Sequence, residues 1–174
     1  KMPTKLEDRF NRINERPPSN ELTGFLAGLG NSSPDLSVEF ARRAKATWPE
    51  DPRSTALLAS RLRWAARYQD AIEQFELLSD EQLLRDDIGM EYSDCLYAVH
   101  QFTDAIAHLQ EIQQHNQIND KSASQGINFR LGTRPRMIQD WKDEQAIRAA
   151  EAERDDNPTA TILIDGTPVQ VELF

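Results

Sequence analysis

One stretch near the middle of the chain has side chains whose types and spacing could hold a metal ion. Asp104, His108, Glu111 and His115 follow one another at i, i+4, i+7 and i+11, so on a helix they would share one face. Two such neighbours could bind a divalent cation, but a site also needs a third ligand and supporting groups. We therefore interpret the stripe as a solvent-exposed helix face, with a metal-binding regulatory or enzyme domain as the alternative.

Other chemistry has little support in the sequence. The single cysteine, Cys95, excludes an internal disulfide and a multi-cysteine zinc site, and beside Leu96 it is typical of a small buried apolar residue. None of the spacings of a glycine-rich phosphate loop, a G-x-S-x-G nucleophile turn or an H-E-x-x-H zinc helix occurs. The sequence predicts a protein that is not an enzyme and needs no cofactor.

Charge and composition narrow the classes of partner. The chain has 174 residues, of which 39% are hydrophobic and 28% charged, and its formal net charge is -9. A negative field repels nucleic acid and anionic lipid surfaces, and no apolar run approaches the ~18 residues of a membrane span. We expect no nucleic-acid binding and no membrane insertion, and we expect a soluble, cytoplasmic protein.

The elements that position these residues show a repeat. "YQDAI" at 68–72 and "FTDAI" at 102–106 lie 34 residues apart. The apolar and small residues of the helices around them recur at the same interval: Leu58, Ala59, Leu62, Ala71, Ile72 and Phe75 in one copy, and Tyr92, Ser93, Leu96, Ala105, Ile106 and Leu109 in the next. An earlier second helix over 35–52 carries Ala41 and Ala44 and ends near Pro49. Such a period predicts stacked helix pairs.

This pattern resembles the tetratricopeptide repeat (TPR) family. The resemblance implies a mainly α fold, a right-handed α-solenoid of helix-turn-helix repeats, over residues 1–158. Within it, 1–17 is predicted to form an N-terminal capping helix because Leu6, Phe10 and Ile13 form one stripe. Residues 113–134 are predicted to be a polar insertion, and Pro135 to break any helix that follows. A degenerate fourth pair would then end at Pro158.

The last segment, 159–174, changes to an alternating pattern around Asp165–Gly166, which predicts a β-hairpin. A two-residue turn would pair Ile162 with Val169 and Ala160 with Val171. One face would then carry Ile162, Ile164, Val169, Val171 and Leu173. A lone hairpin is marginally stable, so it must dock on the helices, on a second copy of the chain or on a partner. We expect it to dock on the chain's own last helix near Trp141 and Ile147.

The TPR resemblance also implies where a partner would bind. In that family ligands usually lie on the concave face formed by the first helix of each pair. Carried over, the candidate partner-binding residues are Arg53, Ser60, Arg63, Trp64, Asp87, Met90, Asp94 and Tyr97. Ala56, Ser60, Met90 and Asp94 stand where family members that grip a C-terminal carboxylate carry their clamp residues, so that activity is not implied. Arg63, Trp64 and Tyr97 are of the types that dominate binding hot spots. The alternative is that Trp64 packs inside the repeat and Arg63 is simply solvated.

The sequence thus predicts a non-catalytic adaptor or scaffold that binds a peptide or helix of another protein. Two alternatives stay open. The hairpin could pair with a second copy in a self-assembly module, which would make a homodimer. The stripe from Asp104 to His115 could instead serve a metal-binding domain.

Overall fold

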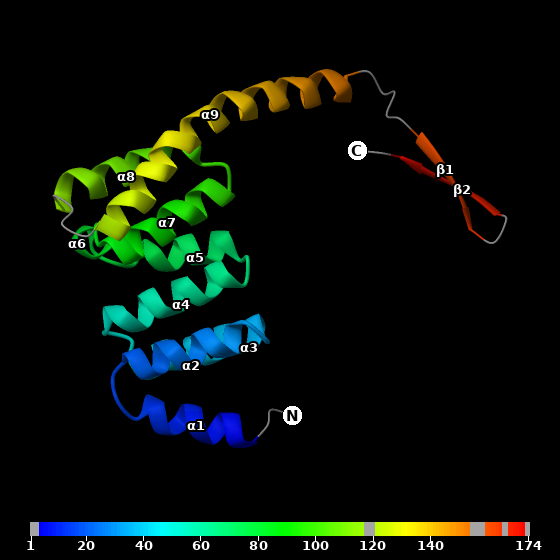
Figure 1. Cartoon of the computed structure of the whole chain (residues 1–174). Coiled ribbons are helices and arrows are strands. Elements are labelled where there is room, and N and C mark those ends of the chain that lie inside the picture. The colour runs from blue at the N-terminus through cyan, green and yellow to red at the C-terminus, as the bar shows by residue number, and fades with distance from the viewer. Residues whose placement is uncertain (1–3, 117–120, 154–158, 165–166, 173–174) are drawn as a thin grey trace. The chain divides into compact units, whose positions relative to one another are not determined.

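The computed structural model describes residues 4–116, 121–153, 159–164 and 167–172. The chain forms two compact units, residues 1–134 and residues 135–174. The first contains the helices α1 to α8 and the beginning of α9, and the second contains the rest of α9 and a hairpin (Figure 1). The prediction of a mainly α fold that ends in a hairpin is confirmed. Within the part of the chain described, no helix combines the length and apolar character needed to cross a membrane.

The predicted capping helix is present as α1 (Thr4–Asn14). Its stripe is buried against the first helix pair, because the Phe10 ring stacks on Phe40 with centroids 4.4 Å apart and Ile13 is also buried. The Asn14 side chain donates to Thr47 Oγ1 at 3.0 Å, and Trp48 Nε1 donates to the Asn14 carbonyl at 3.2 Å. These contacts fix the cap to the end of α3.

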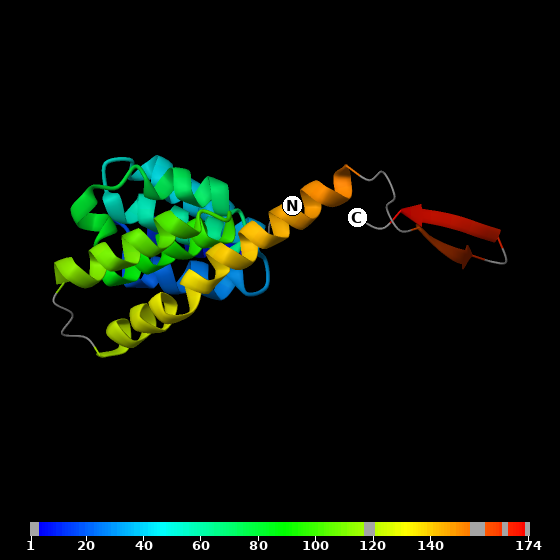
Figure 2. The same ribbon diagram turned by 90° about the horizontal axis from the view of Figure 1, so that it is seen from above.

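Antiparallel helix pairs follow, which stack through the first unit (Figure 1). They are α2 (Asn20–Gly30) with α3 (Pro34–Thr47), α4 (Pro52–Trp64) with α5 (Tyr68–Phe75), and α7 (Asp86–Ala98) with α8 (Phe102–Asn116). The ribbons of α7 and α8 lie side by side in both views (Figure 1 and Figure 2). Ser19 and Asp51 cap α2 and α4 through their side chains, and proline occupies the first turn of α3 and α4, where its missing N–H costs nothing.

The turns inside the second and third pairs repeat in detail. Ala66 has φ 56° and His100 has φ 66°, so two residues 34 apart both adopt the left-handed conformation. The hydrogen bonds around them match as well. Arg67 N donates to the Leu62 carbonyl and Gln101 N to the Leu96 carbonyl, both at 2.9 Å. Such a bond closes the end of a helix and turns the chain back. The predicted 34-residue interval therefore recurs in backbone geometry as well as in residue type.

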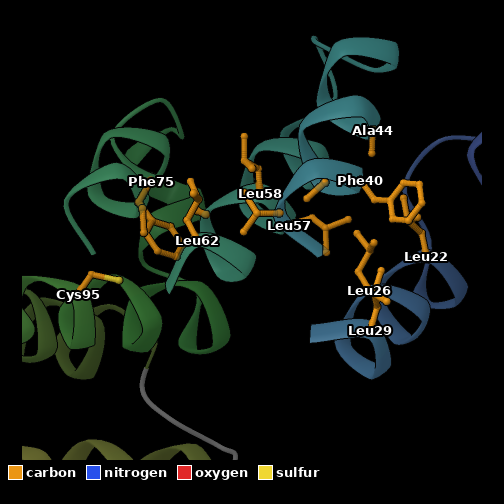
Figure 3. Close-up of a cluster of buried hydrophobic side chains, with 14 of the residues drawn as sticks. Leu22, Leu26, Leu29, Phe40, Ala44, Leu57, Leu58, Leu62, Phe75 and Cys95 are labelled. Carbon is orange, nitrogen blue, oxygen red and sulfur yellow. The ribbon is translucent and has the colours of Figure 1, made fainter. Parts of the chain in front are cut away.

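One continuous core runs through the stacked pairs (Figure 3). Large side chains such as Leu26, Phe40, Leu62 and Phe75 are buried between helices, and the predicted small residues lie where helices touch. Ala59, Ala71 and Ala105 are fully buried, which lets helix axes approach closely. The helix α2 was not predicted, although its buried stripe of Leu22, Phe25, Leu26 and Leu29 has the helical spacing.

A one-turn helix, α6 (Asp80–Leu83), joins the second pair to the third. Ser79 and Gln82 form a reciprocal capping box that closes it. Gly89 lets α7 lie close to α6 and α8, because a Cβ at this position would lie 2.3 Å from the Leu83 carbonyl oxygen and 2.5 Å from Ile112 Cδ1. No side chain fits at that position.

The predicted helix break at Pro135 is wrong. Helix α9 (Lys121–Ala152) is continuous and contains Pro135, so neither the break at Pro135 nor a separate fourth pair is found. Proline removes one backbone donor, but the turns on either side keep theirs. The second half of α9 is polar and exposed, and pairs one turn apart, such as Arg148 with Glu144 at 2.7 Å, support it. The first half docks Ile127 against Leu109 and Ile112.

The hairpin consists of β1 (Thr159–Ile164) and β2 (Thr167–Glu172). The predicted register is confirmed, with Ile162 opposite Val169 and Ala160 opposite Val171. The turn residues Asp165 and Gly166, and Leu173 on the predicted face, lie outside the described residues. Ile162 is 50% exposed. Docking of this face on α9 stays a prediction, as does a domain boundary at residue 158.

Candidate functional site

A groove crosses the first helices of all three pairs. Helix α4 packs against both α2 and α7, and the cavity between them has a volume of about 580 Å³. We call it the central groove. Its lining includes Asn20 and Thr23 from α2, Arg53, Ala56, Leu57, Ser60 and Arg61 from α4, and Asp87, Ile88 and Glu91 from α7. Part of the lining is apolar and consists of Leu57, Phe75, Leu78 and Ile88. The predicted residues Arg53, Ser60 and Asp87 lie here.

Most charges in the central groove are paired locally. Arg53 contacts Asp51 with Nη2–Oδ2 at 2.6 Å, and Arg85 contacts Asp87 at 3.1 Å. The pKa of Asp51 is lowered, chiefly by its hydrogen bond with Arg53. Arg61 is different. It is 7% exposed, and no carboxylate oxygen among the described residues lies within 4.0 Å of it.

A second, smaller cavity of about 370 Å³ lies beyond the end of α4, and we call it the tryptophan pocket. It is lined by Arg63, Trp64, Tyr68, Asp94, Tyr97, Ala98 and Arg134. Trp64 is 60% exposed, with the Arg63 guanidinium 5.8 Å from its ring centre. The alternative that Trp64 packs inside the repeat is therefore wrong. Tyr97 is half-buried against Phe102, with ring centroids 4.9 Å apart.

Asp94 organises the floor of the tryptophan pocket. Arg63 Nη2 donates to its Oδ2 at 3.0 Å, and Arg130 binds both oxygens, with Nε–Oδ1 at 2.8 Å and Nη2–Oδ2 at 3.0 Å. Arg134 also donates to Oδ1, donates to Ser93 Oγ at 2.8 Å, and lies over Tyr97 with its guanidinium carbon 4.6 Å from the ring centre. We call Asp94 with these three arginines the Asp94 cluster. It ties α9 to α4 and α7.

The charge balance of the Asp94 cluster explains its titration. Burial by itself raises the pKa of Asp94, but hydrogen bonds from Arg130 and Arg134 outweigh it and lower the pKa to about 2. The hydrogen bond to Asp94 raises the pKa of Arg130. Three guanidinium groups therefore surround one carboxylate.

The structure divides the predicted binding residues into separate places. Arg63, Trp64, Asp94 and Tyr97 meet in the tryptophan pocket, whereas Arg53, Ser60 and Asp87 line the central groove. Met90 belongs to neither, because it packs beside Leu109, Ile112 and Ile127, with its sulfur 3.9 Å from Arg130 Nη1. The expectation that Asp94 lines an open groove is incomplete, since α9 supplies two of its partners.

Sequence reasoning did not identify Arg61, Arg130 or Arg134. Arg61 directly follows the predicted residue Ser60 and lines the same central groove, but its burial depends on how closely α2 approaches α4. A Cβ at Gly30, the last residue of α2, would lie 3.8 Å from Arg61 Nη1. The i, i+4 spacing of Arg130 and Arg134 was a usable signal, but we predicted a polar insertion over 113–134, which contains both residues.

The four side chains of the candidate metal stripe differ in burial and do not form one group of ligands among the described residues. Asp104, Glu111 and His115 are exposed, but His108 is buried, so the interpretation of the whole stripe as a solvated face is wrong at His108. Its Nε2 lies 3.2 Å from the Leu83 carbonyl oxygen and its ring meets Tyr92 edge-on. Burial lowers the pKa of His108. Among the described residues, no three His, Cys, Asp or Glu side chains are grouped as metal ligands.

Cys95 is fully buried in the core, as predicted. Burial raises the pKa of its thiol to about 12, so the thiolate that would act as a nucleophile is not formed at neutral pH.

Comparison with known proteins supports the fold. No protein-family model matches the sequence, and no curated protein matches it either. The structure is similar to the crystal structure of the Sgt2 TPR domain from Aspergillus fumigatus, with a TM-score of 0.53 and 16% sequence identity. The match covers 86% of this chain and 93% of that chain. At this identity the likeness shows the fold alone. The predicted fold class, a TPR-like α-solenoid with a C-terminal hairpin, is confirmed.

Proposed function

We propose that the protein is a non-catalytic adaptor that binds an extended segment of a partner protein along the central groove. The observation that carries this proposal is the groove itself, which crosses the first helices of three successive pairs. The first helices of a helical-repeat solenoid line its concave face, and such faces bind peptides or helices of other proteins. The similarity to a TPR domain supports a protein-interaction role in kind.

Trp64 is the anchor that we assign to the partner at the edge of this face. A tryptophan that is 60% exposed leaves a large apolar surface in water unless a partner covers it. Arg63 lies next to it and is held in place by Asp94. Trp and Arg are the residue types that supply most hot-spot energy, and anchors of fixed geometry lose little entropy on binding.

Short random peptides displayed on phage, selected on the full chain, provide the probe for a test. Replacing Trp64 by Ala should weaken binding of the selected peptides by ~2 kcal/mol or more. The helical circular dichroism should stay unchanged, because the Trp64 side chain is largely exposed and contributes little to the core. Leu77→Ala is the matched control, because Leu77 is 65% exposed but lines neither cavity. Equal affinities for all three chains would refute the proposal that Trp64 anchors the partner.

Self-assembly through the hairpin is a second candidate, favoured by the exposure of its apolar residues. Leu163 is 69% exposed and Ile164 57% exposed. Unpaired strand edges with such side chains invite pairing with another copy. Glu172 and Pro168 on β2 discourage it, so we expect light scattering to give one oligomeric state for the full chain and for a chain that lacks 159–174. A dimer that becomes a monomer on deletion would favour self-assembly.

A further inference from the structure

Arg61 is a buried cation whose hydrogen-bonding capacity is not met within the protein. Its Nη2 donates to Ser60 Oγ at 3.0 Å, but its Nε is buried without any acceptor. A guanidinium has five N–H donors and keeps its charge, so a buried one is normally matched to a carboxylate or phosphate. Here the side chain is nine-tenths buried and the matching anion is not supplied by the described part of the chain.

The surroundings of Arg61 explain why the side chain is tolerated but not why it is there. Gly30 places the last turn of α2 next to the guanidinium, and the C-terminal end of a helix carries partial negative charge. This dipole offsets part of the cost of burying the charge. It does not provide an acceptor for Nε, and burial lowers the pKa of Arg61. A buried, unmatched charge at a cavity wall is typical of a ligand site rather than of a structural contact.

The central groove provides the remaining chemistry. Arg61 and Ser60 stand on its α4 wall, and Leu57 and Ile88 contribute apolar surface beside them. The pairs of Arg53 with Asp51 and Arg85 with Asp87 cancel their own charges. Glu91 also lines the groove, and its negative charge raises the pKa of Arg61 against the larger effect of burial, although no ion pair joins the two side chains. The groove therefore offers a cation that has no ion-pair partner among the described residues, next to an apolar wall.

We propose that Arg61 binds a side-chain carboxylate, from a single Asp or Glu of the partner segment, with an apolar partner residue beside it. This inference rests on the proposed function, that the central groove binds a partner segment. Because the chain carries a net charge of -9, a polyacidic tract would be repelled as a whole, so one carboxylate among apolar residues fits and an acidic run does not.

Peptides selected on the full chain test this directly. Each enriched peptide is made with an amidated C-terminus, so that any carboxylate belongs to a side chain, and a twin carries Asn for Asp or Gln for Glu. The acidic peptide should bind the wild-type chain at least about tenfold more tightly than its amide twin, because the twin leaves the buried guanidinium unmatched.

Variants separate Arg61 from other charges. In Arg61→Gln the preference for the acidic twin should vanish, whereas Arg42→Gln, an exposed arginine on α3 that lines neither cavity, should keep it. Glu91→Gln should tighten the acidic peptide, since it removes a like charge from the groove wall. If Arg61→Gln fails to fold, the affinities of the acidic peptide and its amide twin for the wild-type chain still show whether the groove prefers a carboxylate.

The outcomes distinguish this inference from the proposal on which it rests. Enriched peptides without Asp or Glu, or a preference for the acidic twin that survives Arg61→Gln, overturn the carboxylate assignment and leave the groove as a binding site. A selection that yields no peptide overturns the proposed function and the assignment together.

Discussion

Two arginines separated by one residue on α4 have opposite electrostatic surroundings. Arg63 belongs to the Asp94 cluster, where a partly buried carboxylate is hydrogen-bonded by three guanidinium groups. Arg61 is more deeply buried, yet its Nε has no acceptor. The first arrangement is explained by folding, because it joins α9 to α4 and α7. The second is not explained by any contact within the described chain, and this difference is the reason for assigning it to a partner.

The largest effect is expected from breaking the Asp94 cluster. Asp94→Asn keeps the shape of the side chain but leaves three arginines without their counter-charge, so the free energy of unfolding should fall by ~3–5 kcal/mol. Urea denaturation followed by circular dichroism measures it. Asp87→Asn is the control, because the exposed pair of Asp87 with Arg85 should contribute ~0–1 kcal/mol. Similar losses in the two variants would mean that the cluster is no more than another surface ion pair.

Acid should remove part of the stabilisation that the Asp94 cluster provides. The pKa of Asp94 is about 2 in the folded chain and 3.8 in the unfolded reference, so its stabilisation is fully present above the unfolded value and is lost as the pH falls through about 2. The expected loss is ~2 kcal/mol in the free energy of unfolding. Denaturation curves at a series of acidic pH values measure it, and in Asp94→Asn this component of the pH dependence should be missing. An unchanged pH dependence in that variant would assign the acid sensitivity to other carboxylates.

Arg61 should respond in the opposite direction. Arg61→Met replaces a buried, unmatched cation by an apolar side chain of similar length, so the free energy of unfolding should rise by ~1 kcal/mol. The matched Arg63→Met removes a paired arginine and should lower it. Thermal denaturation of both variants compares them. If Arg61→Met is the more damaging of the two, Arg61 is a structural residue and the contrast between the arginines fails.

The smallest effect concerns the turn that follows both arginines. Ala66 has φ 56°, a conformation that glycine adopts without penalty, so Ala66→Gly should raise the free energy of unfolding by ~0.5–1 kcal/mol. Ala46→Gly, at an exposed position inside α3, should lower it by about the same amount. Melting temperatures of the two variants measure the difference. A loss of stability in Ala66→Gly would show that the Ala66 methyl contributes packing that outweighs the backbone term.

The part of the fold that could be predicted is the part with a local period. The interval between Ala71 and Ala105 predicted the second and third pairs, and alternation around the hairpin predicted its register. Helix α2 has the same kind of apolar stripe, but it lacks the small residue that recurs in the later copies. Phe25 stands at the position where those copies have Ala59 and Ser93. The continuity of α9 was not predictable from Pro135, because proline normally ends or kinks a helix and the contacts that hold the turns before it, the ion pairs of Arg130 and Arg134 with Asp94, join residues far apart in the sequence.

The candidate site was predicted in residue type but not in arrangement. Counting from the repeat places Arg63, Trp64 and Tyr97 on one face, and they do line one pocket. The same count cannot show that α9 returns to cover Met90 and Asp94, since that contact depends on a segment more than 30 residues further along the chain. Nor can it show that Arg61 is buried, because burial depends on the approach of α2 at Gly30.

The most direct measurement of the central claim is a nuclear magnetic resonance titration of the full, isotope-labelled chain with a selected peptide that carries one acidic residue. Shifts should concentrate on backbone amides of α2, α4 and α7 that line the central groove, and the Arg61 Nε–H resonance should move as the guanidinium group gains a carboxylate partner. The same peptide should leave the resonances of β1 and β2 unchanged. Shifts confined to the hairpin, with the Arg61 resonance unmoved, would contradict the account.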